Sequence, residues 1–81
     1  MYNFRKINER ERLYIEDAIS DFGVMELYGG SREEKDGKII YHLSFYSAHL
    51  SPISPEAGKV GRRIKKALRA DEIWLYGTKI A

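Results

Sequence analysis

The chain contains no cysteine and only two histidines among its 81 residues. The lack of cysteine excludes a disulfide framework, a thiolate nucleophile and a cysteine-based zinc site. His42 and His49 stand at a spacing that no standard metal site uses. The acids Glu33, Glu34 and Asp36 cluster at an expected turn, where solvent keeps carboxylates ionised instead of separating their pKa values. We therefore expect no catalysis, no metal site and no cofactor.

Long hydrophobic runs are missing as well. No stretch approaches the roughly 18 apolar residues that would span a bilayer. The start of the chain, MYNFRKINERERLYIEDA, lacks the apolar core of a signal peptide. A hydrophobic content of 43% with 32% charged residues is typical of a folded, soluble domain. We expect one cytoplasmic domain that spans residues 1–81 and builds one small core.

Two segments show the apolar spacing of a helix. The first covers about residues 9–22, and Asn8 is its candidate N-cap. The second covers about residues 54–70 and opens on a serine–proline pair, which is typical of a helix start. Gly61 lies on the buried stripe of this helix, which indicates a close approach to the sheet. Gly58 lies off that stripe and weakens the helix by roughly 1 kcal/mol relative to alanine.

Strand patterns fill most of the remaining chain. Residues 24–30 and 71–80 are rich in apolar and β-branched side chains, and residues 38–47 alternate clearly between two faces. The Asp-Gly pair of KDGK predicts a type I′ turn that leads into the strand at residues 38–47 from the strand that starts at residue 24. In residues 1–7 the aromatic side chains alternate with polar ones, which favours one more strand.

The element order (β)αββαβ predicts an α+β fold. We expect a small two-layer sandwich, with two helices on one face of a mostly antiparallel sheet of three or four strands. If residues 1–7 form a strand, the order is that of ferredoxin-like, split βαβ domains. The first strand of such a domain is central, whereas Asn3, Arg5 and Lys6 are too polar for a central strand. A three-stranded αββαβ domain is the alternative.

This order and the chain length resemble the RNA-recognition motif family. The third strand of that family carries a basic residue, a glycine and two aromatic residues that stack on bases. The segment KIIYHLSF keeps Lys38, Leu43 and Phe45, lacks the glycine and has His42 at one aromatic position. The resemblance is therefore one of order and length, and we carry over no binding residue from it.

Positive charge is concentrated in residues 58–69, GKVGRRIKKALR, which contain no acid. Residues 54–70 hold six cations and one acid, whereas the rest of the chain holds eight cations and eleven acids. The six cations are Lys59, Arg62, Arg63, Lys65, Lys66 and Arg69. Because a solvated helix face usually mixes both signs, this pattern predicts contact with nucleic-acid phosphates. A plain solvated face and a docking site for an acidic protein are the alternatives.

Aromatic residues are expected on the sheet face away from the helices. Strand alternation places Tyr46, Trp74 and Tyr76 there. Flat aromatic rings on a sheet are a known platform for unpaired bases. Packing of these rings, or a homodimer through this face, is the alternative interpretation.

These patterns lead to the hypothesis of a small module that binds DNA or RNA, with the basic helix on phosphates and the sheet aromatics on bases. If the two sets lie on opposite faces, they cannot serve one strand, and the helix then suits a duplex backbone better. The alternative is a non-catalytic inhibitor or adaptor of the kind that phages and mobile elements encode. Such a protein would dock on a host protein of a nucleic-acid machine.

Overall fold

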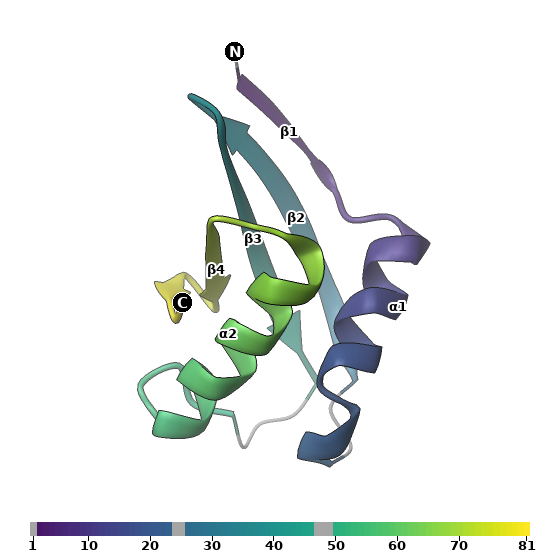
Figure 1. The fold of residues 1–81 in the computed structure, drawn as a ribbon, viewed down its shortest axis with the longest axis vertical. Coiled ribbons are helices and arrows are strands. Elements are labelled where there is room, and N and C mark those ends of the chain that lie inside the picture. Colours follow the sequence, from purple (N-terminus) through teal and green to yellow (C-terminus); the bar gives the residue numbers. More distant parts are fainter. Residues whose placement is uncertain (1, 24–25, 47–49) are drawn as a thin grey trace.

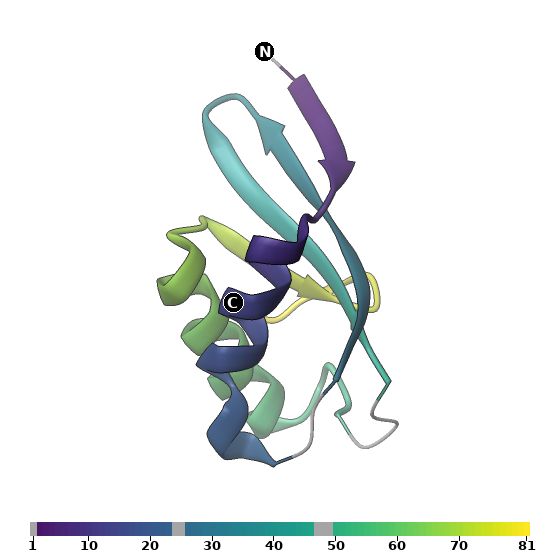
Figure 2. The same ribbon diagram turned by 90° about the vertical axis from the view of Figure 1, so that its right-hand side faces the viewer.

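The computed structural model describes residues 2–23, 26–46 and 50–81, and it shows a two-layer α+β domain (Figure 1). The elements in chain order are β1 (Tyr2–Lys6), α1 (Glu9–Ala18), the 3-10 helix η1 (Ser20–Phe22), β2 (Leu27–Lys35), β3 (Lys38–Phe45), α2 (Pro55–Leu68), β4 (Glu72–Leu75) and β5 (Thr78–Lys79). Both α-helices lie on the same side of the sheet (Figure 2). The expected fold class and the extra strand at the start of the chain are confirmed.

The sheet has five strands in the order β1-β2-β3-β4-β5. Strand β1 pairs antiparallel with β2, β2 with β3 and β4 with β5, whereas β3 and β4 are parallel and joined through α2. The ferredoxin-like arrangement expected with this extra strand, in which the first strand is central, therefore does not describe this sheet, nor does the three-stranded alternative. Strand β5 adds a strand to the expected three or four. The edge position of β1 has a simple physical reason, because all five of its residues are exposed and a polar strand is tolerated there.

Local signals place the helices and the hairpin. The Asn8 side chain accepts a hydrogen bond from the Glu11 amide at 2.8 Å, and the Glu11 carboxylate accepts one from the Asn8 amide at 2.9 Å. This reciprocal pair is a capping box. The α-helix ends earlier than predicted, at Ala18, and η1 continues to Phe22. Asp36 and Gly37 have φ angles of 51° and 81°, as the predicted turn requires.

The core lies between the helix layer and one face of the sheet. The predicted alternation of β3 is confirmed, because Tyr41, Leu43 and Phe45 are buried. The buried side chains from the other elements include Ile15, Ile19, Leu27, Leu50, Ala57, Val60, Ile64, Ile73 and Leu75. A Cβ atom on Gly61 would lie 2.8 Å from Ile80 Cγ1, so a side chain at this position would require Ile80 to shift. Gly61 therefore marks a close approach, but its neighbour is the segment after β5 and not the sheet that the sequence had predicted.

One buried carboxylate joins three elements at the upper end of the core. Glu11 of α1 accepts hydrogen bonds from the Arg5 guanidinium of β1 at 2.8 and 3.1 Å. It also accepts one from the Tyr41 hydroxyl of β3 at 2.5 Å. The same carboxylate thus completes the helix cap and ties the edge strand to the centre of the sheet.

Candidate functional site

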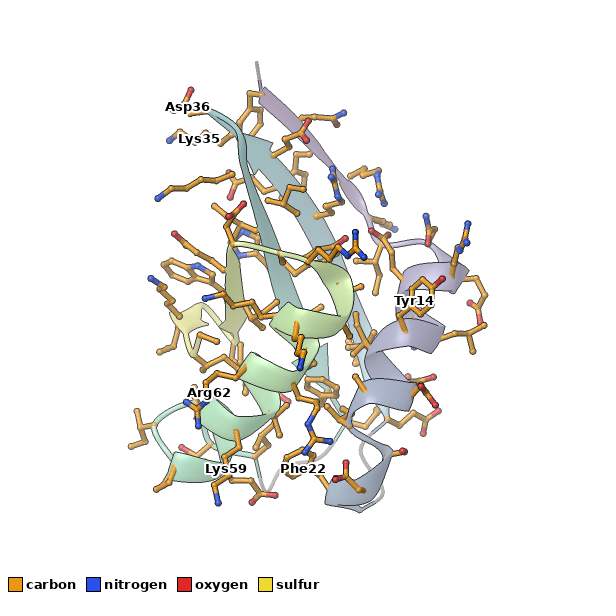
Figure 3. The ribbon with its side chains drawn as sticks, in the orientation of Figure 1. Tyr14, Phe22, Lys35, Asp36, Lys59 and Arg62 are labelled. Carbon is orange, nitrogen blue, oxygen red and sulfur yellow. The ribbon has the colours of Figure 1, made fainter. Side chains whose placement is uncertain are left out.

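Helix α2 presents the predicted cations because its opposite face is fully buried. Ser54 caps the helix by accepting a hydrogen bond from the Ala57 amide at 3.3 Å, and Pro55 occupies the first helical position. The inward stripe consists of Ala57, Val60, Gly61 and Ile64, all of which are buried. The cations lie on the remaining arc, and Figure 3 shows Lys59 and Arg62 at the surface of α2 on the side away from α1.

Arg63 differs from the other cations of α2 because it is used within the fold. Its guanidinium lies 2.8 Å from the Asp21 carboxylate and donates to the Ala18 carbonyl at 3.2 Å. It also lies 5.0 Å from the centre of the Phe22 ring, a cation–π contact. Arg63 therefore connects α2 to the end of α1, and its charge is already balanced.

The other five cations form what we call the basic face of α2, namely Lys59, Arg62, Lys65, Lys66 and Arg69. None of them forms an ion pair with any residue that the structure describes. All but Lys59 line, together with Ala70, one shallow hollow of about 460 Å³. Outside α2, several cations have acidic partners within 4.0 Å, namely Arg5, Arg12, Arg32 and Lys38. The basic face thus combines high charge density with the absence of neutralising partners.

The neighbouring helix does not extend this positive surface. The sequence of α1, ERERLYIEDA, contains four acids and two arginines. Its Glu9 and Glu16 lie 3.8 and 3.9 Å from the Arg12 guanidinium. Within the helix layer, positive charge is therefore concentrated on α2.

Trp74 lies on the sheet face away from the helices, as predicted. Strand pairing sets it beside His42 on β3 and Lys79 on β5, whereas its neighbours Ile73 and Leu75 are fully buried. The indole N–H donates to Glu72 at 2.9 Å, and the ring lies 5.8 Å from the His42 ring. Its orientation is thus fixed by contacts within the sheet.

Tyr46 and Tyr76 have different environments. Tyr46 is 62% exposed and packs edge-on against Tyr28 at 5.0 Å. Tyr76 follows β4 in a turn with a φ of 50°, and its hydroxyl donates to the Phe45 carbonyl and accepts from the Phe45 amide. Tyr76 therefore satisfies the backbone of β3 at the point where β4 has ended, a role that strand alternation did not predict.

The uncovered sheet face carries ionised acids beside these rings. Hydrogen bonds with His42 and Tyr2 hold the pKa of Glu33 below its usual value. The hydrogen bond from Trp74 does the same for the pKa of Glu72. Both carboxylates therefore stay charged at neutral pH, and they repel phosphate from this face.

A hollow of about 720 Å³ crosses this sheet face. Gly29 contributes to its floor, and no heavy atom lies within 4 Å of the position where its Cβ would be. The walls include Tyr28, His42 and Tyr76, and positive charge comes from Lys6 and Arg12. Sequence analysis did not assign Lys6 or Tyr28 to a site. The Gly29-Gly30 pair within a strand was the signal that could have located this hollow.

The two predicted sets of site residues lie on opposite sides of the domain (Figure 2). The basic face belongs to the helix layer, whereas Tyr46 and Trp74 belong to the face that the helices do not cover. One short nucleic-acid strand therefore cannot contact both sets together. The sequence left open whether the basic helix and the sheet aromatics lie on one face or on opposite faces. Their opposite placement favours nucleic-acid binding through the helix alone.

Comparisons with protein-family models, with curated proteins and with solved structures found no match. In residues 2–23, 26–46 and 50–81 no three side chains of histidine, cysteine or acid type gather as metal ligands, and His49 lies outside these ranges. No helix in the described part of the chain is long and apolar enough to cross a membrane.

Proposed function

We propose that this protein is a small, non-catalytic module that binds the phosphate backbone of double-stranded nucleic acid through the basic face of α2. One observation carries the proposal: five cations share one helix face, and none forms an ion pair with a described residue. Unpaired cations at this density repel one another, and phosphates relieve that repulsion. Each phosphate that a cation neutralises also releases a counterion, which drives binding at low salt.

The dimensions of the basic face suit a duplex. Lys59 lies in α2 and Arg69 is the C-cap residue ten positions later, which is a distance of roughly 15 Å at 1.5 Å per residue. The major groove of B-form DNA is about 12 Å wide. Cations at the two ends of α2 can therefore reach phosphates on both sides of a groove.

A duplex is favoured over a single strand because single-strand binders combine cations with stacking rings in one groove. Here the rings of Tyr46 and Trp74 lie on the other side of the domain, beside the ionised Glu33 and Glu72. We therefore assign the sheet aromatics no role in base stacking next to the bound backbone. Contacts to phosphates alone give shape recognition with little dependence on base sequence.

The inhibitor or adaptor hypothesis is the second candidate function. The exposure of Tyr28 and Tyr46, 64% and 62%, favours it, because aromatic residues are enriched in protein interfaces. In that case the protein partner would contact the uncovered sheet face, and its binding would depend weakly on salt.

Fluorescence anisotropy of labelled 20-base-pair DNA, of RNA duplexes and of matched single strands tests the proposal across a salt series. We expect micromolar duplex binding at about 50 mM salt, with a slope of log K against log salt of about −4.5 for five phosphate contacts. Single strands should bind more weakly than either duplex. Absence of duplex binding at low salt, or a slope near zero, would contradict the proposal.

A further inference from the structure

Among the residues that the structure describes, no strand lies along the outer edge of β1. In the sheet order β1 comes first, and it pairs only with β2. All five of its residues are exposed, and Tyr2 and Phe4 keep 59% and 55% of their surface in contact with solvent. An open edge of this kind is a template for pairing with a further strand.

The alternation of the backbone shows which groups of β1 point outward. The Ile7 amide donates to the Gly30 carbonyl on β2 at 3.1 Å. Because N–H and C=O groups of successive residues point to opposite sides of a strand, Asn3 and Arg5 face β2 in the same way. The backbone groups of the even-numbered residues, Tyr2, Phe4 and Lys6, therefore face away from the sheet.

We propose that two copies of this chain pair antiparallel through β1, with Phe4 directly opposite Phe4 of the partner subunit. In this register Tyr2 lies opposite the partner subunit's Lys6, and Asn3 lies opposite the partner subunit's Arg5. Each pair of outward-facing residues then exchanges two backbone hydrogen bonds, which satisfies every outward group of the strand.

The side chains of β1 favour this register over its neighbours. A shift of two residues in one direction sets Arg5 opposite Arg5 of the partner subunit, which places like charges together. A shift of two residues in the opposite direction leaves Lys6 without an opposite residue in the described strand of the partner subunit. In the proposed register the Phe4 rings pair across the axis, and the Lys6 ammonium meets an aromatic ring.

The usual protection of an edge strand by charge is weak here. The Arg5 guanidinium is bound by Glu11 at 2.8 and 3.1 Å, so its charge is partly balanced and repels a second strand less than a free arginine would. Lys6 is the other cation of β1, and it belongs to no ion pair among the described residues. This charge distribution accommodates a copy of the same strand.

The two-fold axis of this pairing runs perpendicular to the sheet. Both helix layers therefore lie on the same side of one continuous sheet, and the two basic faces point toward the same side of the dimer. The pairing itself does not depend on nucleic-acid binding. A contact through one five-residue strand is shorter than about 17 Å and smaller than a standard interface, so we expect a weak dimer with a dissociation constant above about 10 μM.

Sedimentation velocity at protein concentrations from about 10 μM to 1 mM tests the pairing with two matched variants. Phe4→Pro removes the outward N–H but no hydrogen bond to β2, whereas Phe4→Ala removes the ring and keeps the N–H. We expect the natural chain to dimerise as concentration rises and Phe4→Pro to weaken the dimer at least tenfold, more than Phe4→Ala does. A natural chain that stays monomeric throughout, or a folded Phe4→Pro variant that dimerises equally well, would overturn the proposal.

Disulfide cross-linking tests the register directly, because the chain has no cysteine of its own. In the proposed register two residues at position 4 are about 5.5 Å apart between Cα atoms, within the range of a disulfide. We expect Phe4→Cys to form an intermolecular disulfide much faster than the control Tyr28→Cys, which introduces a thiol at a similarly exposed site on β2. Equal rates for the two variants would refute the register, including in the case where Phe4→Pro does not fold.

Discussion

Replacing Arg62 and Lys66 together by glutamate is expected to weaken duplex binding by about 100-fold at low salt. The two side chains lie one turn apart on the basic face and line the same hollow. Each substitution removes a phosphate contact and adds a charge that repels the backbone. The slope of log K against log salt should therefore become shallower by about 2. Anisotropy titrations of the variant and the natural chain, on the same duplex, measure both changes.

A matched variant separates the position of the charge from its amount. Lys35→Glu with Lys38→Glu changes net charge by the same amount at the β2–β3 turn, and Figure 3 shows Lys35 at the far tip of this hairpin. This variant breaks one ion pair, between Lys38 and Glu72, and such exposed pairs contribute little stability. We expect its duplex affinity to fall less than fivefold, through long-range attraction only. Equal losses in both double variants would show that net charge, and not the basic face, governs binding.

Replacing Glu11 by glutamine is expected to lower the free energy of unfolding by about 2–3 kcal/mol. The carboxylate is 9% exposed and receives hydrogen bonds from Arg5, Tyr41 and the Asn8 amide. Glutamine keeps the size of the side chain, but it cannot balance the Arg5 charge, and its NH2 group replaces an oxygen that accepts hydrogen bonds. Urea unfolding at pH 7 measures the loss. The control Glu9→Gln alters a mostly exposed side chain in the same helical turn and should change stability by less than about 0.5 kcal/mol.

The difference in the free energy of unfolding between the natural chain and Glu11→Gln should depend on pH. Burial alone raises the pKa of Glu11, but the hydrogen bonds from Arg5, Tyr41 and Asn8 outweigh it and lower the pKa from 4.5 to about 2. A carboxyl whose folded pKa is lowered stabilises the fold fully above its unfolded pKa and loses that contribution as pH falls toward the folded value. The stability gap between the natural chain and Glu11→Gln should therefore be constant above about pH 5 and shrink between pH 4.5 and 2. A gap that stays constant down to pH 2 would contradict this account.

Features coded by adjacent residues could be predicted from the sequence. The Asn8 and Ser54 caps, the proline at the first position of α2 and the Asp-Gly turn depend on backbone groups within about four residues. The faces of β3 and β4 followed from period-two alternation, because the side chains of successive residues point to opposite sides of a strand. Strand alternation therefore predicted the position of Trp74, and the helical period predicted the basic face of α2 in the same way.

Features that depend on distant partners could not be predicted. Arg63 matched the other cations in sequence, yet its partner Asp21 is 42 residues away. Tyr76 likewise binds the backbone of Phe45, 31 residues earlier. The order of strands has the same origin, since the choice of β2 as the neighbour of β1 is a tertiary contact that no local pattern of β1 specifies.

We propose that the outer side of α2 is the surface that meets a duplex. A nitrogen–hydrogen correlation NMR titration of the labelled protein with a short DNA duplex tests it most directly. The account predicts that the shifted backbone amides cluster at Lys59, Arg62, Lys65, Lys66 and Arg69, while His42, Tyr46 and Trp74 stay unchanged. Shifts centred on the uncovered sheet face, or no shifts at low salt, would contradict the claim.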